Sequence, residues 1–372
     1  MAQKSDNLKE IPASKILAKI EKGEPVEYDH VHINGNLDVS GLSHVTSQIT
    51  ITNSEINGVS NFSEAIFENP VKFEGTVFIG ETYSQKSRFN GYACFSDAKF
   101  CKESYFEETI FNGEVYFRET IFNGHAFFFR TIFCKGIPLG VYFNKAVFYK
   151  DAHFSGAYFN GNAHFDSANF CCDSFYHDAW FLGSASFNAS HFERRALFIR
   201  SHFEGENLSL KNTEFKNPQD QENACRLAKK AFENTGDRDA ASYHFYREMN
   251  AIRKQKPWYI RYPEFFFIQL IFGYGVHPFR LMFCWFAVAT IFAIIYSAEG
   301  GIISKLPASS LPQPLSYFVE CFYFSIVTAV TPGYGKYELT SWVYQAIASI
   351  EAIFGTFMWA AFIATFARKY MK

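Results

Sequence analysis

The residues best suited to chemistry form a short loop at positions 331–335, which reads Thr-Pro-Gly-Tyr-Gly. The loop lies between two long apolar stretches, residues 279–296 and 342–366. Gly333 and Gly335 give the backbone unusual freedom, so that successive carbonyl oxygens can face the same side. Carbonyl oxygens in such an arrangement can replace the hydration shell of a cation. The chemistry indicated is ion coordination within a membrane.

Other kinds of functional site find little support in the composition. The chain of 372 residues has a net charge of −2, which gives no electrostatic basis for binding nucleic acid. Its eight cysteines form no Cys-x-x-Cys pair, so we expect reduced thiols without a zinc site or a disulfide framework. The sequence shows neither a nucleophile paired with a base nor a pair of carboxylates that would indicate catalysis. We therefore expect neither an enzyme nor a bound cofactor.

Two apolar stretches are long enough to cross a bilayer. We expect spans at about 279–297 and 342–367, whereas the apolar segment at about 317–330 is too short to cross. A segment that ends at membrane depth is tolerated when it is buried in protein or lines a water-filled path. We therefore expect residues 317–330 to form a helix that crosses half of the membrane. Basic residues gather before the first span and after the second, which places both termini in the cytoplasm. The expected location is therefore the cytoplasmic membrane.

The order of span, half-helix, glycine-rich loop and span resembles the pore of two-transmembrane potassium channels, which assemble as tetramers. The resemblance implies that residues 331–335 are a selectivity filter and that Tyr334 packs behind it. The implied K⁺ ligands are the Thr331 hydroxyl and the backbone carbonyls of Thr331, Pro332, Gly333 and Tyr334. The residues expected to support the filter are Tyr323, Phe324, Val327, Thr328 and Glu351.

Three residues depart from the pattern of that family. Pro332 replaces the usual Val or Ile, and it keeps a carbonyl but lacks the N–H that would anchor the loop. Val327 is apolar where some relatives place a carboxylate. Lys336 replaces the usual Asp at the outer mouth, where a ring of cations would repel permeant ions. Because of these departures, two alternatives stay open: a potassium-selective pore, and a less selective pore that also passes Na⁺.

The second span carries residues expected to serve the inner part of the pore. Gly355 falls where the family has its gating hinge. Thr356, Trp359 and Ile363 follow at helical spacing and are expected to line the inner vestibule. Glu351 is a carboxylate in the middle of a span, which marks a functional site by default. We favour a hydrogen-bonded clamp to the pore helix over a charge that faces the pore.

About half of the chain, residues 31–216, is a repeat built on phenylalanine. The spacing of Phe alternates between five and six, and a small or β-branched residue stands two places earlier, as in the run of Phe at 95, 100, 106, 111, 117, 122, 128 and 133. Neither a helix nor simple strand alternation gives this period, whereas a chain that turns a corner about every five residues does. The pattern resembles the pentapeptide-repeat family. That resemblance implies a right-handed quadrilateral β-helix, with the Phe and the small residues pointing into its shaft.

Several details of this solenoid follow from the repeat. We expect about eight coils, located in the cytoplasm, with breaks at residues 82–87 and 136–140. The histidines at outward positions show no metal-ligand clustering in the sequence, and we interpret them as solvated surface: His153, His164, His177 and His191. Whether the solenoid binds an unidentified ligand or a protein partner is left open by the sequence.

The remaining segments connect or close these two parts. Residues 1–30, with a helix at 10–23, are expected to cap the solenoid, because a bare terminal coil would expose apolar surface and unpaired strand edges. The sequence of residues 217–257 predicts a helical hairpin that closes the other end of the solenoid. The aromatic segment 258–277 predicts an interfacial helix, and residues 278–372 form the pore domain.

The sequence as a whole predicts a mixed fold: a β-solenoid, a helical hairpin linker and an all-α pore domain. The function predicted is a homotetrameric cation channel in the lipid bilayer that conducts K⁺, with the solenoid as a scaffold or regulatory domain. A membrane-anchored scaffold without conduction is the alternative from another class. An anchor, however, has no use for a glycine-rich loop between its spans.

Overall fold

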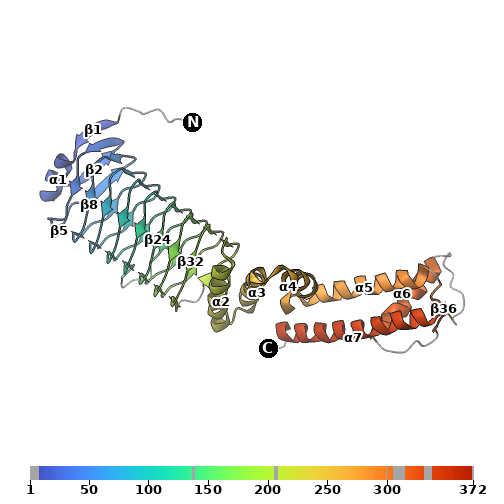
Figure 1. Ribbon diagram of the computed structural model, residues 1–372. Helices are drawn as coiled ribbons and strands as arrows, with labels where there is room; N and C mark the ends of the chain where they lie inside the picture. The colour runs from blue at the N-terminus through green and yellow to red at the C-terminus, as the bar shows by residue number, and fades with distance from the viewer. Residues whose placement is uncertain are drawn as a thin grey trace. The chain divides into compact units, whose positions relative to one another are not determined.

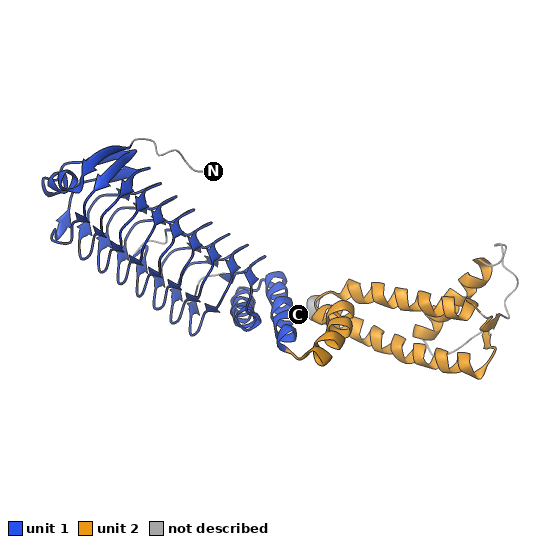
Figure 2. Cartoon of the chain, turned by 45° about the horizontal axis from the view of Figure 1, so that its top comes forward, with its two compact units in different colours: residues 1–255 blue, residues 256–372 orange. Residues whose placement is uncertain are grey.

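The computed structural model describes residues 8–135, 139–204, 208–298, 300–304, 315–330 and 337–370. The chain divides into two compact units, residues 1–255 and 256–372 (Figure 2). Among the described residues, unit 1 contains a parallel β-solenoid and three helices, and unit 2 contains two long apolar helices at the C-terminal end. The predicted fold class is confirmed.

The solenoid winds through four parallel sheets of 10, 9, 8 and 8 strands, which correspond to about nine turns (Figure 1). The first sheet contains β1 (Lys9–Pro12), β3 (Val31–Asn34), β7 (Glu55–Ile56), β11 (Val77–Phe78), β15 (Lys99–Phe100), β19 (Ile121–Phe122), β23 (Val147–Phe148), β27 (Asn169–Phe170), β31 (His191–Phe192) and β35 (Glu214–Phe215). The second contains β2 (Val26–Asp29), β6 (Ile49–Thr52), β10 (Val71–Lys72), β14 (Ala93–Cys94), β18 (Val115–Tyr116), β22 (Val141–Tyr142), β26 (Ala163–His164), β30 (Ala185–Ser186) and β34 (Leu208–Ser209). The third contains β4 (Leu37–Asp38), β8 (Ser60–Asn61), β12 (Thr82–Tyr83), β16 (Ser104–Tyr105), β20 (Ala126–Phe127), β24 (Ala152–His153), β28 (Ser174–Phe175) and β32 (Ala196–Leu197). The fourth contains β5 (His44–Val45), β9 (Ile66–Phe67), β13 (Arg88–Phe89), β17 (Ile110–Phe111), β21 (Ile132–Phe133), β25 (Tyr158–Phe159), β29 (Trp180–Phe181) and β33 (His202–Phe203).

Phenylalanine fills the shaft of the solenoid. Phe100, Phe122 and Phe148 are fully buried, and their rings stack from coil to coil with centroids 5.0 and 4.8 Å apart. The small residues two places before the aromatic positions point inward as well. Among them, Thr120 and Thr131 are buried, and their hydroxyls donate to carbonyl oxygens of the preceding coil at 2.7 Å. These bonds tie neighbouring coils together around a continuous aromatic core, whereas the inward hydroxyls of Ser60, Thr82, Ser84 and Ser104 have no hydrogen-bond partner among the described residues.

Only one of the two expected breaks interrupts the coils. Thr82 pairs with Ser60 and with Ser104, each 22 residues away, so residues 82–87 continue the regular winding. The prediction of a break there is wrong, because Ser84 occupies an inward position and is fully buried. At the second position, Ile132 pairs with Ile110, 22 residues before it, and with Tyr158, 26 residues after it. Four extra residues are therefore inserted between β21 and β22, the stretch that contains the expected break at 136–140, and residues 136–138 fall outside the described residues.

Each end of the solenoid is covered by its own segment. At the N-terminal end, β1 pairs with β3, and helix α1 (Ala13–Glu21) buries Ile16 and Ile20. The expected helix over 10–23 is shorter than predicted, because the residue before Pro12 favours extended backbone. At the other end, helix α2 (Pro218–Thr235) contributes Ala224 and Ala228 to the core of the solenoid.

Helix α2 and helix α3 (Arg238–Gln255) form a hairpin at that C-terminal end of the solenoid. Gly236, with a φ of +80°, ends α2, and the side chain of Asp237 accepts from the Ala240 N–H at 3.0 Å to start α3. Glu248 of α3 is 3% exposed and accepts from Arg226 and Lys229 of α2, both at 2.9 Å. The hairpin is thus joined by ion pairs to the buried Glu248 as well as by apolar contacts.

Unit 2 begins with a short aromatic segment and continues with three apolar helices. The segment comprises helix α4 (Trp258–Glu264), the π-helical turn η1 (Phe265–Ile271) and the 3₁₀ turn η2 (Gly273–Gly275). Helices α5 (Pro278–Ala298), α6 (Leu315–Val330) and α7 (Trp342–Tyr370) follow. A two-stranded antiparallel sheet, β36 (Ile302–Ser304) with β37 (Tyr337–Leu339), joins the segments that flank α6.

The aromatic segment exposes large apolar side chains along most of its length. Trp258, Tyr259, Tyr262 and Phe267 are each more than half exposed. Lys256 pairs with Glu264 at 2.8 Å beside them. A short, strongly aromatic and partly charged segment is typical of the membrane–water interface, which is where the sequence places residues 258–277.

Candidate functional site

The glycine-rich loop predicted as the ion site lies outside the described residues, together with Lys336. The structure does define what stands on either side of residues 331–336. Helix α6 ends at Val330, and strand β37 begins at Tyr337. The candidate site is therefore built from the contacts that hold these two ends.

The end of α6 is held by a close contact with α7. A Cβ atom added to Gly355 would lie 2.2 Å from the carbonyl oxygen of Ala329 and 2.6 Å from its Cα. Only glycine allows the two backbones to approach so closely. Gly355 lies within the uninterrupted helix α7, and Ala329 is 4% exposed. The predicted role of Gly355 as a hinge stays a prediction, whereas its role in helix packing follows from this contact.

The segment that follows the loop is held by an aromatic group and a strand pair. Tyr337 is 7% exposed, and its ring meets the edge of the Phe324 ring with centroids 5.6 Å apart. Strand β37 pairs with β36, in which the Ile302 carbonyl accepts a hydrogen bond from the Tyr317 hydroxyl at 3.0 Å. Because Tyr317 and Phe324 both belong to α6, this helix fixes the positions of the chain before and after the loop.

Glu351 connects the three apolar helices. Its side chain is 1% exposed and accepts a hydrogen bond from the Tyr296 hydroxyl of α5 at 2.7 Å. The Ser325 hydroxyl of α6 also contacts the carboxyl group of Glu351, and it lies 2.8 Å from the Ala289 carbonyl oxygen of α5. Polar groups buried among apolar helices need such partners. Glu351 thus links α7 both to the pore helix predicted at 317–330 and to the first span.

The other residues predicted to support the loop occupy different environments on α6. Phe324 is buried between Tyr337 and Tyr296, with its ring centroid 5.1 Å from that of Tyr296. Thr328 is 2% exposed, and its Oγ1 has no hydrogen-bond partner among the described residues. Val327 is half-buried, whereas Tyr323 is 55% exposed.

The three residues predicted to line the inner vestibule lie on the second half of α7. The Thr356 hydroxyl donates to the Ala352 carbonyl of its own helix at 2.8 Å, and Ile363 is 55% exposed. The Trp359 ring lies 6.5 Å from the Trp285 ring of α5 and lines an apolar cavity of about 270 Å³ between α5, α6 and α7. The assignment of these side chains to a vestibule stays a prediction.

Sequence reasoning missed several residues of this site. Tyr296 and Ser325 complete the contacts of Glu351, and Tyr337 anchors the chain after the loop. A signal was present for the first two, because polar side chains inside apolar helices require a polar partner. The short pairing of Ile302 with Leu339 carries no such signal, because three-residue strands give too little alternation to recognise.

The structure also corrects the interpretation of one solenoid histidine. His153 was predicted to lie apart from other metal-ligand types, but His125 and Asp151 lie beside it. The four-residue insertion sets the coils 26 residues apart here, so that Phe127 pairs with His153. His125 therefore stands one coil away from Asp151 in space, although the two are far apart in sequence.

Comparison with known proteins assigns unit 2 to a class. A family model described as ion channel matches residues 281–372. Within the described residues, two helices are long and apolar enough to cross a membrane, Pro278–Ala298 and Trp342–Ala367. No curated protein and no solved structure matched the chain. The chain thus carries an ion channel domain at its C-terminal end, joined to a β-solenoid of about nine turns.

Proposed function

We propose that four copies of this chain assemble into a potassium-conducting channel of the cytoplasmic membrane. The observation that carries the proposal is the arrangement within the ion channel domain. Helix α6 is too short to cross and stands between two helices that are long enough to span. Directly before residues 331–336 the end of α6 packs against α7, and directly after them Tyr337 packs on Phe324 of α6. Backbone carbonyls that replace the hydration shell of an ion have to be held around it, and contacts on both sides of the segment serve that purpose.

In this proposal the backbone carbonyls of residues 331–334 and the Thr331 hydroxyl bind K⁺ along the axis of the tetramer. Glu351 acts as a clamp that holds α6 against α5 and α7. Thr356, Trp359 and Ile363 line the inner vestibule, and Lys336 forms a ring at the outer mouth. A pore that passes Na⁺ as readily as K⁺ is the second candidate, because Pro332 and Lys336 depart from the resembled filter.

The solenoid belongs to the cytoplasmic side in this proposal, with both termini in the cytoplasm. Four parallel sheets around a shaft of stacked phenylalanines support its assignment to the pentapeptide repeats. Its role is that of a scaffold or regulatory domain, and the proposal assigns no catalytic activity to the chain.

Flux measurements on the full-length chain in liposomes test the proposal. We expect K⁺ flux that exceeds Na⁺ flux in the wild type, and a particle mass of four chains. Gly333→Ala restricts the backbone freedom that the carbonyl ring requires, so it should abolish flux while the solenoid stays folded. Gly41→Ala is the matched control, because a Cβ at Gly41 meets no atom within 4 Å.

The possible results separate the candidate functions. Equal K⁺ and Na⁺ flux would favour the less selective pore. Absence of flux from a correctly assembled wild type would favour a membrane-anchored scaffold. Wild-type flux from Gly333→Ala would contradict the assignment of residues 331–335 as the ion site.

A further inference from the structure

One outward-facing ladder of the solenoid contains a histidine among carbon rings. In the sheet that contains β20 and β24, the stacked outward positions are occupied in order by Tyr83, Tyr105, Phe127, His153 and Phe175. The His153 ring stacks on Phe127 with centroids 5.0 Å apart and on Phe175 at 4.7 Å. A phenylalanine would fill this position equally well, so stacking alone does not account for an imidazole.

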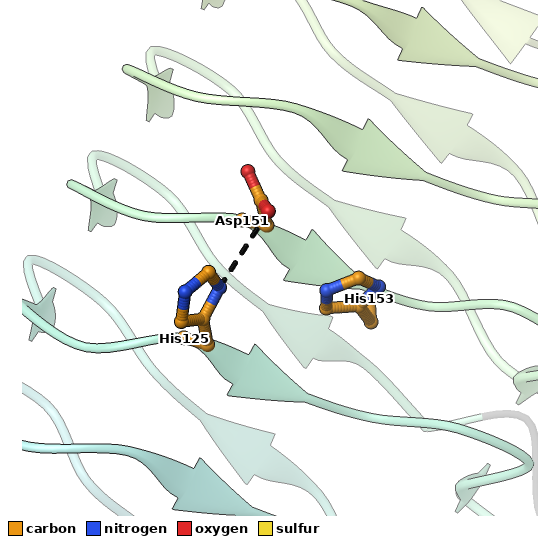
Figure 3. Close-up of side chains that lie close together, drawn as sticks. All are labelled: His125, Asp151 and His153. Atoms are coloured by element: carbon orange, nitrogen blue, oxygen red, sulfur yellow. Dashed lines mark ion pairs between the residues drawn. The ribbon is translucent and has the colours of Figure 1, made fainter.

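Two further ligand types stand beside this imidazole. His125 comes directly before β20, and Asp151 comes directly before β24, so both side chains leave the same face of neighbouring coils (Figure 3). His125 Nδ1 lies 3.6 Å from Asp151 Oδ2, and one ligand atom from each of the three residues lies within 4.8 Å of the others. All three residues are half-buried.

The hydrogen bonds of the group leave its ligand atoms available. Asp151 Oδ1 accepts from the Asp173 backbone N–H at 3.1 Å, which fixes the carboxylate and leaves Oδ2 directed at His125. His125 Nδ1 is buried and has no hydrogen-bond partner among the described residues. A buried polar atom without a partner calls for a ligand, an ion or a water.

The surroundings favour a cation. Glu103 precedes the strand on one side of the group, and Asp173 precedes the strand on the other side. The neutral imidazole is the form of histidine that binds metals.

The donor set indicates which cations fit. Two imidazoles and one carboxylate are ligands that Zn²⁺ and related transition metals prefer, whereas Mg²⁺ and Ca²⁺ prefer oxygen alone. Ligand atoms of a tetrahedral zinc ion stand roughly 3.4 Å apart, as follows from metal–ligand bonds of about 2.0–2.1 Å. The His125–Asp151 contact is already close to that separation, and rotation of the His153 side chain would bring in the third ligand.

We propose that His125, Asp151 and His153 bind one Zn²⁺-type transition-metal ion that bridges two neighbouring coils of the solenoid. The site joins the coils on either side of the four-residue insertion. Three protein ligands leave the fourth position of the ion to water or to another small ligand. This site is independent of ion conduction in unit 2.

Metal titration of the full-length, chelator-treated protein tests the proposal. We expect one Zn²⁺ per chain by calorimetry, and Co²⁺ should show the visible absorption of a tetrahedral site when it takes the same place. His153→Phe preserves the ladder, since both stacking neighbours are phenylalanine, and it should weaken Zn²⁺ binding at least about ten-fold, as even outer-shell changes do. Asp151→Asn keeps an acceptor for the Asp173 N–H and should weaken Zn²⁺ binding in the same way.

His164→Phe provides the matched control. His164 also takes a ladder position, stacked on Tyr142 at 5.1 Å, and it lies 3.8 Å from Asp166. It belongs to no group of three ligands among the described residues. We expect this variant to bind Zn²⁺ as the wild type does, and Zn²⁺ to raise the melting temperature of both but not that of His153→Phe.

Three results would overturn the proposal. The first is a folded wild type that binds neither Zn²⁺ nor Co²⁺. The second is unchanged affinity in both His153→Phe and Asp151→Asn. The third is an equal loss of binding in His164→Phe, which would indicate surface histidines binding the metal without a specific site. If His153→Phe fails to fold, Asp151→Asn decides the question.

Discussion

The solenoid and the ion channel domain bury their apolar residues in different ways. In unit 1 the aromatic side chains of the repeat lie inside the shaft, and Phe100, Phe122 and Phe148 are inaccessible to solvent. In unit 2 many large apolar side chains face outward, with Phe283 76% exposed and Ile353 73% exposed. The solenoid completes its core within one chain. An exposed apolar surface of this kind is typical of helices that are surrounded by lipid.

The comparison also shows where polar groups are placed. In the solenoid of unit 1 most polar side chains lie on the outside, and the inward Thr120 and Thr131 donate to the backbone of the preceding coil. In unit 2 the relation is reversed, because Glu351, Ser325 and Tyr296 meet in the middle of three apolar helices. Each unit therefore has its own most sensitive positions, and substitutions at those positions can be used to test the contrast.

The largest effect is expected at the closest contact of unit 2. Gly355→Ala would place a Cβ 2.2 Å from the Ala329 carbonyl oxygen, so α6 must move away from α7 directly before residues 331–336. We expect loss of ion flux, while the thermal unfolding of the solenoid is unchanged. Ser349→Ala is the control, since Ser349 is exposed and its hydroxyl donates to the Gln345 carbonyl of its own helix. Normal flux from Gly355→Ala would show that this contact does not support the ion site.

The matching test in unit 1 removes one ring from the shaft. Phe143 is fully buried and stacks on Phe117 and on Phe165, each at 4.9 Å. Phe143→Ala should lower the free energy of unfolding by about 3–5 kcal/mol, measured by chemical denaturation of the full chain. Tyr149→Ala removes a ring that is 51% exposed and should have little effect. Similar losses from both variants would contradict a self-contained core.

The hairpin at the end of the solenoid is expected to respond to acid. His244 is 2% exposed and stacks on Phe232, and burial together with the charge of Arg247 lowers its pKa to about 4. As the pH drops below 6.5, His244 takes up a proton in the unfolded chain but not in the folded chain. The free energy of unfolding is therefore unaffected by His244 above pH 6.5 and falls as the pH drops toward 4. The loss is on the order of 3 kcal/mol at most.

A histidine replacement measures this acid response. His244→Gln should flatten the fall in unfolding free energy between pH 6.5 and 4, as followed by denaturation at several pH values. His30, which is 67% exposed, provides the control, because His30→Gln should leave the profile unchanged. An unaltered profile in His244→Gln would rule out this residue as the source.

The smallest expected effect concerns the polar contacts among the helices of unit 2. Glu351→Gln and Tyr296→Phe each disturb the bond of 2.7 Å between these residues, and each should destabilise unit 2 by about 1–3 kcal/mol. In the double variant the loss of stability should be smaller than the sum of the two single losses, because both substitutions remove the same hydrogen bond. Tyr323→Phe is the control, since Tyr323 is 55% exposed. Thermal unfolding in detergent provides the measurement, and strict additivity would contradict direct coupling.

The sequence predicts the repeated parts of the structure best. The Phe period predicts the coils, since each ring occupies an equivalent inward position. The same rule misleads at Ser84, because the backbone winding continues there with a small residue in an inward position. The pairing of His125 with Asp151 depends on the exact length of the insertion at 136–140, which sets the offset between coils. Spacing in sequence alone therefore could not reveal that group.

For the ion channel domain, the apolar stretches at 279–297 and 342–367 fall within helices α5 and α7. The clamp proposed for Glu351 could be anticipated from a carboxylate within an apolar span, but its partners could not. Ser325 and Tyr296 come from two other helices, and only tertiary packing brings them together. The β36–β37 pair likewise joins segments on opposite sides of α6, and pairs of short strands leave little trace in sequence.

The regular 22-residue pairing of the coils has a consequence for how such a protein can change in length. Each coil offers its successor the same edge, as in the pairing of Phe78 with Phe100 and of Phe100 with Phe122. Removal or duplication of one whole coil preserves that register, while any other number of residues changes the spacing between paired positions, as in the 26-residue offset between Ile132 and Tyr158. The length of the solenoid is therefore set by a whole number of coils. Its length can change in steps of about 4.7 Å per coil without a new core being designed.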